Sequence, residues 1–434
     1  MKTLGIDIGT TTISAVVHDS VSGILGAMNI KNGTFLPSSP WERIQDPKQI
    51  REKALDCIQK MLAKFPDVQA IGVTGQMHGI LYLDREGNAV SPLYTWQDGR
   101  GDLPYDASTS WAKHLSDITG YPLSTGYGMA THYYNGRNGL IPDAAVTFCT
   151  IQDYVAMSLA GTTGPHINQT NAASLGLYDC LRRCFDTSAM EKAGMNPDML
   201  PPMASSPLLG VGPLGLPVYA AIGDNQASFL GATEGKRDVL LVNMGTGGQV
   251  SVFSPRYLQT GTLETRPFPG GGWLLVGASL CGGRSYALLE QFFRQTVKMV
   301  TGQDIPAYDA MAVMLEQSPC LDDLPKCTTT FQGTRTDPFR RASITGLTEN
   351  NFTPAHLTWS VMEGMAQELY EMYHSFLDAG GKKPVQMIGS GNGLRKNPWL
   401  CKVFEHTFQC PMTLSLNDEE AACGAAVYAA EHII

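Results

Sequence analysis

Two short segments place an acidic or amide side chain just before a Gly-Thr turn. The first, GIDIGTTT, has Asp7 before Gly9, and the second, VNMGTGG, has Asn243 before Gly245 and Thr246. Backbone N–H and hydroxyl groups in such turns donate hydrogen bonds to phosphate oxygens, and glycine lets a phosphate approach the backbone closely. The pair therefore predicts two similar phosphate-binding turns, although a single Gly-Thr turn is also common in ordinary hairpins.

We expect Asp7 at the end of the first apolar strand, so its carboxylate would lie close to a phosphate bound at the turn. Two negative charges at short distance need a cation between them, and Mg²⁺ that keeps several of its waters is the usual one. The alternative is that Asp7 caps its own turn by accepting a hydrogen bond from nearby backbone.

Asp224 follows a second apolar strand and a glycine in the segment AAIGDNQAS. A carboxylate at the end of a strand is placed to accept a proton from a substrate hydroxyl. The alternative is an aspartate that caps the helix expected from Asn225 onwards.

Two further segments carry side chains typical of carbohydrate sites. GQMHG contains Met77 and His78, and TWQDGR contains Trp96, Asp98 and Arg100. A sugar needs an apolar face for its C–H groups and planar polar groups for its paired hydroxyls, which these residue types supply. Each segment alone is a weak indication, because a single histidine is more often structural and a tryptophan among charges is often part of a surface turn.

A glycine-rich segment near the end of the chain, IGSGNGLRKN, has Gly389, Gly391 and Gly393 at the spacing G-x-G-x-G. The dinucleotide fingerprint requires G-x-G-x-x-G, so a dinucleotide site is not expected. The sequence also lacks the P-loop pattern G-x-x-x-x-G-K-[ST]. A glycine-rich loop that receives an adenine base is the favoured interpretation.

The elements that position these residues occur in a similar order in both halves. Each Gly-Thr turn joins two apolar strands as a hairpin, and each hairpin is followed later by an amphipathic helix and a further strand. The first helix has Asp46 as N-cap before Pro47, the second has Thr353 before Pro354 and ends near Gly380, and an acidic segment begins a last helix at about residue 418. This order predicts an α/β protein with a duplicated domain.

Composition narrows the class of protein. The chain has 434 residues, 43% of them apolar, and a net charge of −9, so it lacks the basic surface that nucleic-acid binding requires. No apolar run approaches the length of a membrane span, and the first residues do not resemble a signal peptide. Ten cysteines without a C-x-x-C pair favour reduced thiols. We therefore expect a cytoplasmic enzyme with no nucleic-acid or membrane partner.

The motifs DIGTTT, GQMHG, TWQDGR, GDNQ, NMGTGG, GASLCGG and IGSGNGLRKN, in this order, resemble the FGGY carbohydrate kinases along nearly the whole chain. The resemblance implies an α/β fold of two duplicated actin-like (ribonuclease H-like) domains with a nucleotide and sugar cleft between them. It also implies a sugar-binding domain at residues 1–226 and an ATP-binding domain at residues 227–434.

The resemblance further implies roles for individual residues, with ATP and Mg²⁺ as cofactors. Asp224 is expected to be the catalytic base and Asp7 the metal ligand. Sugar contacts are expected from Met77, His78, Trp96, Asp98 and Asn225, and phosphate or nucleotide contacts from Thr10, Thr11, Gly245, Thr246, Gly282, Gly391, Asn392 and Asn397.

Within the family, the segments TGYGMATHYY, IQDYV and NAASLG are similar to those of sedoheptulokinases, whereas Asn225 after Asp224 is more similar to xylulokinases. The expected reaction is phosphorylation of the terminal hydroxyl of a ketose, with sedoheptulose as the first choice and xylulose or another ketose or polyol as alternatives. Outside this class, a non-catalytic actin-like sugar sensor is the competing hypothesis. The sequence leaves the oligomeric state open, a homodimer included.

Overall fold

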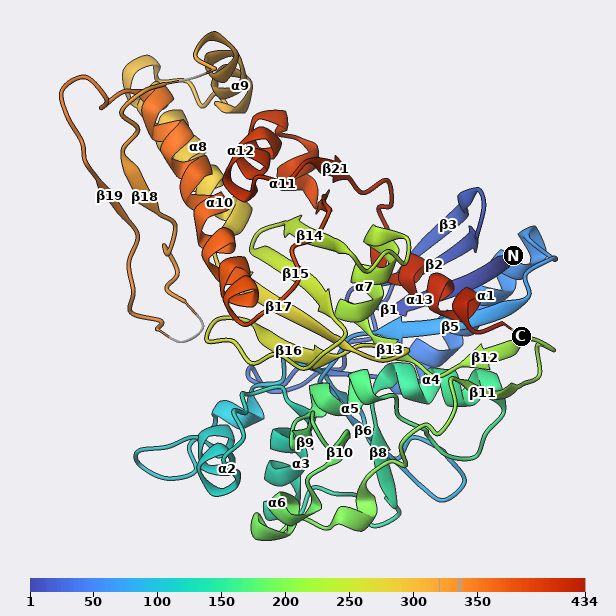
Figure 1. Ribbon diagram of the computed structural model, residues 1–434. Helices are drawn as coiled ribbons and strands as arrows, with labels where there is room; N and C mark the ends of the chain where they lie inside the picture. The colour runs from blue at the N-terminus through green and yellow to red at the C-terminus, as the bar shows by residue number, and fades with distance from the viewer. Residues whose placement is uncertain (320, 335–336, 434) are drawn as a thin grey trace. The chain divides into compact units, whose positions relative to one another are not determined.

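The computed structural model describes residues 1–319, 321–334 and 337–433 (Figure 1). The chain forms two compact units. The first unit consists of Met1–Gly235, Arg266–Gly271 and Asn417–Ile434. The second unit consists of Lys236–Thr265 and Gly272–Leu416. The first unit is therefore assembled from three separate stretches of the sequence.

This division differs from the boundary predicted at residue 226, which falls inside helix α7 (Asp224–Thr233). Helix α7 packs against the last helix of the chain, α13 (Glu420–Glu431), and both belong to the first unit. Because these two helices share one interface, the compact unit extends to Gly235 and takes in the C-terminal segment.

The first unit is built on a sheet with the order β11-β12-β5-β1-β2-β3, in which β13 also pairs with β5. Strands β1 and β2 form the predicted hairpin around the first Gly-Thr turn, and β1 runs parallel to β5. The strands are β1 (Lys2–Ile8), β2 (Thr12–Asp19), β3 (Gly23–Lys31), β5 (Ala70–Gly75), β11 (Leu208–Val211), β12 (Pro217–Tyr219) and β13 (Ile222–Gly223).

The second unit repeats this topology in a sheet with the order β16-β17-β15-β14-β20-β21. Strands β14 and β15 form the second predicted hairpin, β17 extends it, and β14 runs parallel to β20 just as β1 runs parallel to β5. The strands are β14 (Val239–Met244), β15 (Gly248–Ser254), β16 (Glu264–Pro267), β17 (Trp273–Ser279), β20 (Gln386–Ser390) and β21 (Met412–Leu414). The duplication predicted from the sequence is thus present in the strand order.

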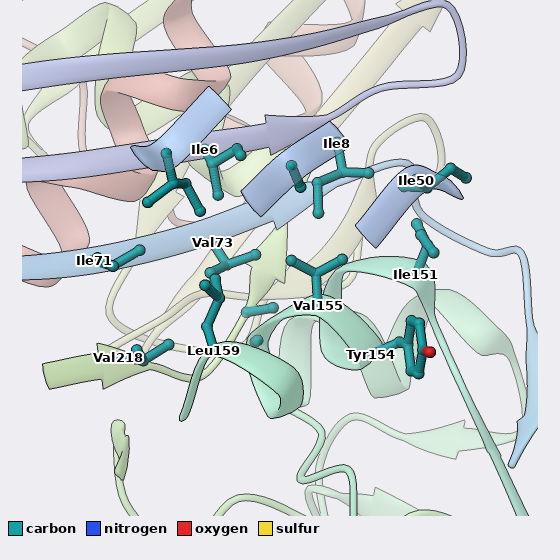
Figure 2. Close-up of a cluster of buried hydrophobic side chains, with 14 of the residues drawn as sticks. Ile6, Ile8, Ile50, Ile71, Val73, Ile151, Tyr154, Val155, Leu159 and Val218 are labelled. Carbon is teal, nitrogen blue, oxygen red and sulfur yellow. The ribbon is translucent and has the colours of Figure 1, made fainter. Parts of the chain in front are cut away.

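One face of the first sheet forms the main core of its unit. Leu4, Ile6 and Ile8 alternate along β1 on this face and pack with helices α1 (Pro47–Lys64) and α4 (Ile151–Ala160). Figure 2 shows Ile6 and Ile8 beside Val73 of β5 and above side chains of α4. Burial of this apolar face stabilises the strand ends that carry the polar residues described below.

The opposite face of β1 lies against helix α13, which Figure 1 shows in red beside this sheet. Thr3 of β1 donates a hydrogen bond to a carbonyl of α13 at 2.8 Å. A methyl group at Gly5 or Gly72 would lie 1.9 Å from a backbone oxygen of α13, so these glycines permit direct contact between helix and sheet. Asp7 belongs to this face, because side chains alternate along a strand.

The predicted N-caps Asp46 and Thr353 are confirmed. Asp46 accepts hydrogen bonds from the backbone N–H groups of the first turn of α1. Thr353 caps α10 (Pro354–Asp378) in the same way, and Gly380 follows this helix with a φ of 84°. Helix α10 packs on the second sheet and lies beside α8 (Gly282–Thr301).

The remaining elements connect or flank the two sheets. In the first unit they are β4 (Ile44–Gln45), β6 (Leu81–Leu83), β7 (Leu93–Tyr94), β8 (Thr147–Cys149), β9 (Tyr178–Asp179), β10 (Cys184–Phe185), α2 (Trp111–Thr119), α3 (Gly128–Arg137), α5 (Gln169–Leu175), α6 (Thr187–Lys192) and the 3₁₀ helices Gly99–Asp102 and Pro197–Met199. In the second unit they are α9 (Tyr308–Gln317), β18 (Lys326–Thr328), β19 (Ser343–Thr345), α11 (Asn392–Arg395) and α12 (Pro398–Phe408). In the described part of the chain, no helix combines the length and the apolar character needed to cross a membrane.

Candidate active site

Three strands of the first sheet end side by side and carry the predicted polar residues. Strands β1, β5 and β13 are parallel, with Ile8 opposite Gly75 and Gly75 opposite Gly223. The carboxyl ends of parallel strands in an α/β sheet are the usual location of a ligand site. This edge therefore brings together the residues that follow β1, β5 and β13.

Asp224 lies at this edge as the first residue of α7. Its carboxylate accepts hydrogen bonds from the backbone N–H groups of Asn225 and Met77. Burial raises the pKa of Asp224 to about 6, although the charge of Arg266 and these two hydrogen bonds act in the opposite direction. Because Gly223 is the N-cap and no side chain caps α7, Asp224 is not the helix cap that the alternative interpretation expected.

Asp7 lies near the end of β1 and has acidic neighbours. Burial and, to a smaller extent, the negative charges of Asp224 and Glu419 together raise the pKa of Asp7 to about 7. Glu419 precedes α13, and its carboxylate accepts a hydrogen bond from Asn29 at 2.6 Å. Three carboxylates therefore concentrate negative charge at this end of the sheet, where a divalent cation would relieve the repulsion.

Direct protein ligands for a metal are few at this position. Across the described residues, no group of three or more His, Cys, Asp or Glu side chains has the geometry to hold a metal ion. Mg²⁺ in phosphoryl-transfer sites typically uses one or two carboxylates together with waters and substrate phosphates. Asp7 as a single carboxylate ligand fits that kind of site.

Met77 and His78 follow β5 and lie close to Asp224. A Cβ atom at Gly223 would lie 3.0 Å from the sulfur of Met77, so this glycine lets the loop after β5 approach the start of α7. His78 adopts a positive φ of 72°, which is strained for a non-glycine residue. Its ring Nδ1 donates to the carbonyl oxygen of Ser174 at 2.6 Å and its ring packs on Tyr127. Such strain is typical of a side chain fixed for binding.

Asn225 adjoins Asp224 and has an unused acceptor. Its Oδ1 atom is buried without a hydrogen-bond partner among the described residues. A buried acceptor that is unpaired costs about 1–3 kcal/mol, so such atoms are rare unless a ligand completes them. A sugar hydroxyl would supply the missing donor.

Trp96 is linked to the first Gly-Thr turn. Its indole N–H donates to the hydroxyl of Thr10 at 3.0 Å, and that hydroxyl donates to Gln76 at 3.2 Å. Gln45 donates to the carbonyl oxygen of Thr10 at 2.9 Å. The Thr10 hydroxyl is thus engaged within the protein, whereas the side chain of Thr11 is exposed at the tip of the turn.

Asp98 has a different environment from the other predicted sugar contacts. Its side chain has no exposed area, and it accepts hydrogen bonds from the guanidinium of Arg100 and from the backbone N–H of Arg43. Arg100 is itself buried and stacks on the ring of Tyr94 at 4.0 Å. Both carboxylate oxygens of Asp98 are therefore used in hydrogen bonds that stabilise the loop that carries Trp96, and neither is free for a ligand.

A buried polar network, which the sequence analysis did not predict, holds the strand β13 that precedes Asp224. Asn171 donates to the carbonyl oxygen of Ala221 at 3.0 Å and to Asp153 at 3.2 Å. The hydroxyl of Thr170 accepts a hydrogen bond from the backbone N–H of Gly223 at 3.0 Å. The only sequence indication for this network was the similarity of the IQDYV and NAASLG segments to family motifs.

The second Gly-Thr turn is supported by the start of α8. The backbone N–H groups of Gly283 and Arg284 donate to the carbonyls of Gly245 and Thr246 at 3.0 and 3.1 Å. A Cβ atom at Gly282 would lie 2.3 Å from a backbone nitrogen in β15, so this predicted nucleotide contact is also a position of close packing. Thr246 itself is exposed.

The glycine-rich segment follows β20, next to the second turn. Asn243 of β14 donates to the hydroxyl of Ser390 at 2.6 Å, and Gly391 has a φ of 83°. Asn392 is exposed at the start of the short helix α11. Asn397 instead caps α12, because its side-chain oxygen accepts the N–H of Leu400 at 3.1 Å.

Comparison with known proteins defines the class of enzyme. Residues 2–231 match the N-terminal domain of the FGGY family of carbohydrate kinases, and residues 240–432 match its C-terminal domain. The chain therefore belongs to the FGGY family of carbohydrate kinases, and it is a phosphotransferase whose acceptor is a sugar hydroxyl.

The individual relatives are kinases named for different sugars. The chain is 28% identical to the sedoheptulokinase of Mus musculus, over 98% of this chain and 96% of that protein. It is 23% identical to the xylulose kinase of Staphylococcus xylosus, over 98% and 90%. The solved xylulose kinase from Rhodospirillum rubrum superposes with a TM-score of 0.82 at 23% identity, over 99% of this chain and 89% of that one. The actin-like fold of this family is thus shared, and the predicted fold class is confirmed.

Proposed function

We propose that this chain is an ATP-dependent ketose kinase that converts sedoheptulose to sedoheptulose 7-phosphate. The observation that carries the proposal is the position of Asp224 at the carboxyl end of β13, beside Met77, with a pKa raised to about 6. A general base works best when its pKa lies near the operating pH. The similarity to the sedoheptulokinase of Mus musculus over 98% of the chain supports the choice of sugar.

In the proposed reaction, Asp224 accepts the proton of the terminal sugar hydroxyl. The hydroxyl oxygen forms a bond to the γ-phosphorus of ATP while the bond from this phosphorus to the β,γ-bridging oxygen breaks and ADP leaves. Because such transition states are loose, positioning and charge stabilisation supply most of the catalysis. We assign sugar positioning to Met77, His78, Trp96 and the unpaired acceptor of Asn225.

The phosphates and the cation are assigned to the two Gly-Thr turns. Asp7 would hold Mg²⁺, which supplies positive charge to the phosphates when it is bound. The hydroxyl of Thr11 and the second turn at Gly245 and Thr246 remain accessible for phosphate contacts. For Thr10, whose hydroxyl is engaged, the assigned group is its backbone N–H.

The nucleotide contacts are assigned to the edge of the second sheet. Gly391 and Asn392 lie at the end of β20, in the second unit that also carries the turn at Gly245. Gly282 would contribute backbone only, and Asn397 would act through the start of α12 that it caps.

Initial rates of sugar-dependent ADP release test the sugar. The panel is sedoheptulose, xylulose, ribulose, fructose and glycerol, each with ATP and Mg²⁺. The proposal expects the highest kcat/KM with sedoheptulose. A higher value with xylulose would favour the alternative supported by the xylulose kinases, which match 98% of the chain. Absence of ADP release with every sugar would contradict a kinase function and favour a non-catalytic sugar sensor.

Asp224→Asn tests the catalytic base. The amide cannot accept the proton, so we expect kcat to fall by about 10²–10⁴-fold while ATP binding and folding persist. Asp46→Asn is the matched control, because Asp46 is also an aspartate at a helix start and asparagine is an equally good cap. Near-normal turnover of Asp224→Asn would overturn the assignment.

A further inference from the structure

Residues 266–271, with the sequence RPFPGG, form a segment that we call the strap, which begins with the last two residues of β16. The chain on both sides of the strap belongs to the second unit, but the strap itself belongs to the first. Phe268 anchors it, because its side chain has no exposed area and its ring contacts Phe229 of α7 edge to face, with the centroids 5.7 Å apart. The strap is therefore a fixed part of the unit that carries Asp224.

Two buried or partly buried amides hold the backbone of the strap. Gln226 donates from Nε2 to the carbonyl oxygen of Pro267 at 2.8 Å, and Gln169 donates to that of Phe268 at 2.9 Å. Gln226 lies two residues after Asp224 in the first turn of α7, and Gln169 begins α5 next to Thr170. Both anchors thus belong to the elements that position Asp224.

Because Gln226 holds Pro267 at the first turn of α7, the preceding residue Arg266 lies near the start of this helix, where Asp224 is. Arg266 precedes Pro267, and its positive charge acts on the carboxylate of Asp224. The charges that act on Asp7 are those of Asp224 and Glu419, and both are negative. Arg266 thus supplies a positive charge that acts on one member of this acidic group.

The position of Arg266 near Asp224 is important because the negatively charged phosphoryl group is transferred to the oxygen that Asp224 deprotonates in the proposed reaction. A general base must lie within about 2.6–3.2 Å of the hydroxyl that it deprotonates, so the surroundings of Asp224 are also those of the acceptor oxygen. The phosphoryl group arrives at that same oxygen with charge spread over its three equatorial oxygens. A guanidinium pairs two of its N–H groups with two phosphate oxygens, which an ammonium cannot do.

We propose that Arg266 is a catalytic residue whose guanidinium binds the phosphoryl group as this group reaches the sugar hydroxyl held by Asp224. The inference rests on the proposed kinase function. Arg266 stays protonated throughout: the proton of the hydroxyl goes to Asp224, the new bond joins the sugar oxygen to phosphorus, and ADP is the leaving group. Arg266 contributes charge and geometry to the transition state and takes part in no proton transfer.

Arg266→Gln and Arg266→Lys test this role with the sugar that gives the highest rate in the panel. Loss of one charged donor to a transition state typically lowers kcat by about 10²–10³-fold, and we expect that loss in Arg266→Gln with a change in sugar KM below about threefold. We expect Arg266→Lys to recover only part of the rate, because it keeps the charge but not the paired geometry.

Arg182→Gln is the matched control. Arg182 also lies beside an aspartate, with its Nε 3.6 Å from Asp179, but its side chain is 81% exposed and remote from the strap in sequence. Its kcat should equal that of the wild type. Thermal unfolding checks the fold of every variant, and Arg266→Gln should remain folded because Gln169, Gln226 and Phe229 hold the strap through other residues. If Arg266→Gln does not fold, Arg266→Lys decides: a loss in kcat of tenfold or more supports the proposal, and wild-type kcat overturns it.

Equilibrium binding separates this inference from the proposed function. Calorimetry measures the Kd of the sugar and of its phosphorylated product for the wild type and for Arg266→Gln. We expect an unchanged Kd for the sugar and a Kd for the phosphate that is at least tenfold weaker. Wild-type kcat in a folded Arg266→Gln, or a rise in sugar KM alone, overturns the role of Arg266 while the kinase stands. Absence of turnover in the wild type overturns the kinase itself.

Discussion

At the scale of single residues, the candidate site contains several buried or partly buried carboxylates, which are rare in the interior of a protein. Asp7 and Asp224 both have a raised pKa, because burial disfavours the charged form and, for Asp7, acidic neighbours add to the effect. Such perturbed groups at the edge of a sheet are typical of functional sites. The sequence predicted both residues because Asp7 lies at the end of an apolar strand and Asp224 follows one.

Asp7→Asn tests the metal assignment. We expect a higher Mg²⁺ concentration for half-maximal ADP release, because the amide gives the cation no negative charge. The free energy of unfolding without ligands should not fall, since the change removes repulsion with Asp224 and Glu419. Asp19→Asn, at the other end of the same hairpin, is the control. An unaltered Mg²⁺ dependence would return Asp7 to the role of a turn cap.

Asp153→Asn tests the buried network through pH. Burial raises the pKa of Asp153 to about 7, above its ordinary value of 3.8, so the folded state binds this proton more tightly than the unfolded state. This contribution to stability is complete below about pH 4 and is lost as the pH rises through 7. The difference in free energy of unfolding between wild type and Asp153→Asn should therefore shift in favour of the variant between pH 5 and pH 8. Urea titrations measure it, and an equal difference at both pH values would contradict the prediction.

At the scale of elements, helices α7 and α13 approach each other through glycine. A methyl group at Gly424 would lie 1.7 Å from the carbonyl oxygen of Ala227, and one at Gly231 would lie 1.9 Å from that of Glu420. Because α13 also contacts the sheet directly at Gly5 and Gly72, it cannot shift away from α7 without colliding with the sheet. The crossing fixes α7, whose first residue is Asp224.

Gly424→Ala should therefore destabilise the first unit. Overpacking of a close contact costs about 1–3 kcal/mol, which exceeds the gain in helix propensity of up to about 1 kcal/mol. Chemical unfolding measures the change. Gly136→Ala is the matched control in helix α3, because its added methyl meets only one side-chain atom at 3.6 Å. The prediction fails if both variants are equally stable.

The sequence predicted elements better than it predicted contacts between them. The hairpins and the caps Asp46 and Thr353 depend on local turn and helix chemistry, which a sequence displays directly. The burial of Asp98 against Arg100 depends on how a loop packs, and the pattern Trp-x-Asp-x-Arg reads the same for a ligand contact and for a support. Arg266 stood outside every motif considered, because only the tertiary fold brings the strap to Asp224.

At the scale of the whole molecule, the two units share a strand order but are assembled differently. The first unit needs three stretches of chain, and residues 417–434 supply the helix that covers one face of its sheet. The second unit is interrupted only by the strap. The duplication visible in the sequence therefore does not divide the chain into two independent halves.

A fragment of residues 1–235 tests this dependence. Without α13, the face of the sheet at Gly5 and Gly72 is uncovered, so we expect no cooperative thermal unfolding. Joining residues 417–434 to the fragment through a flexible linker should restore a cooperative transition, which circular dichroism can follow. A cooperative transition in the unlinked fragment would contradict the prediction.

The late position of α13 also bears on synthesis at the ribosome. A nascent chain that has emerged as far as Gly235 carries β1 and β5 but must wait for the residues up to Glu420 and beyond before α13 can dock. At roughly 5–20 residues per second, that interval lasts on the order of tens of seconds. During it the glycine-lined face of the sheet is open to solvent, so this face is where a chaperone would meet the nascent chain. Translation that stops before α13 would leave α7, and with it Asp224, without its packing partner. The truncated protein should therefore be inactive.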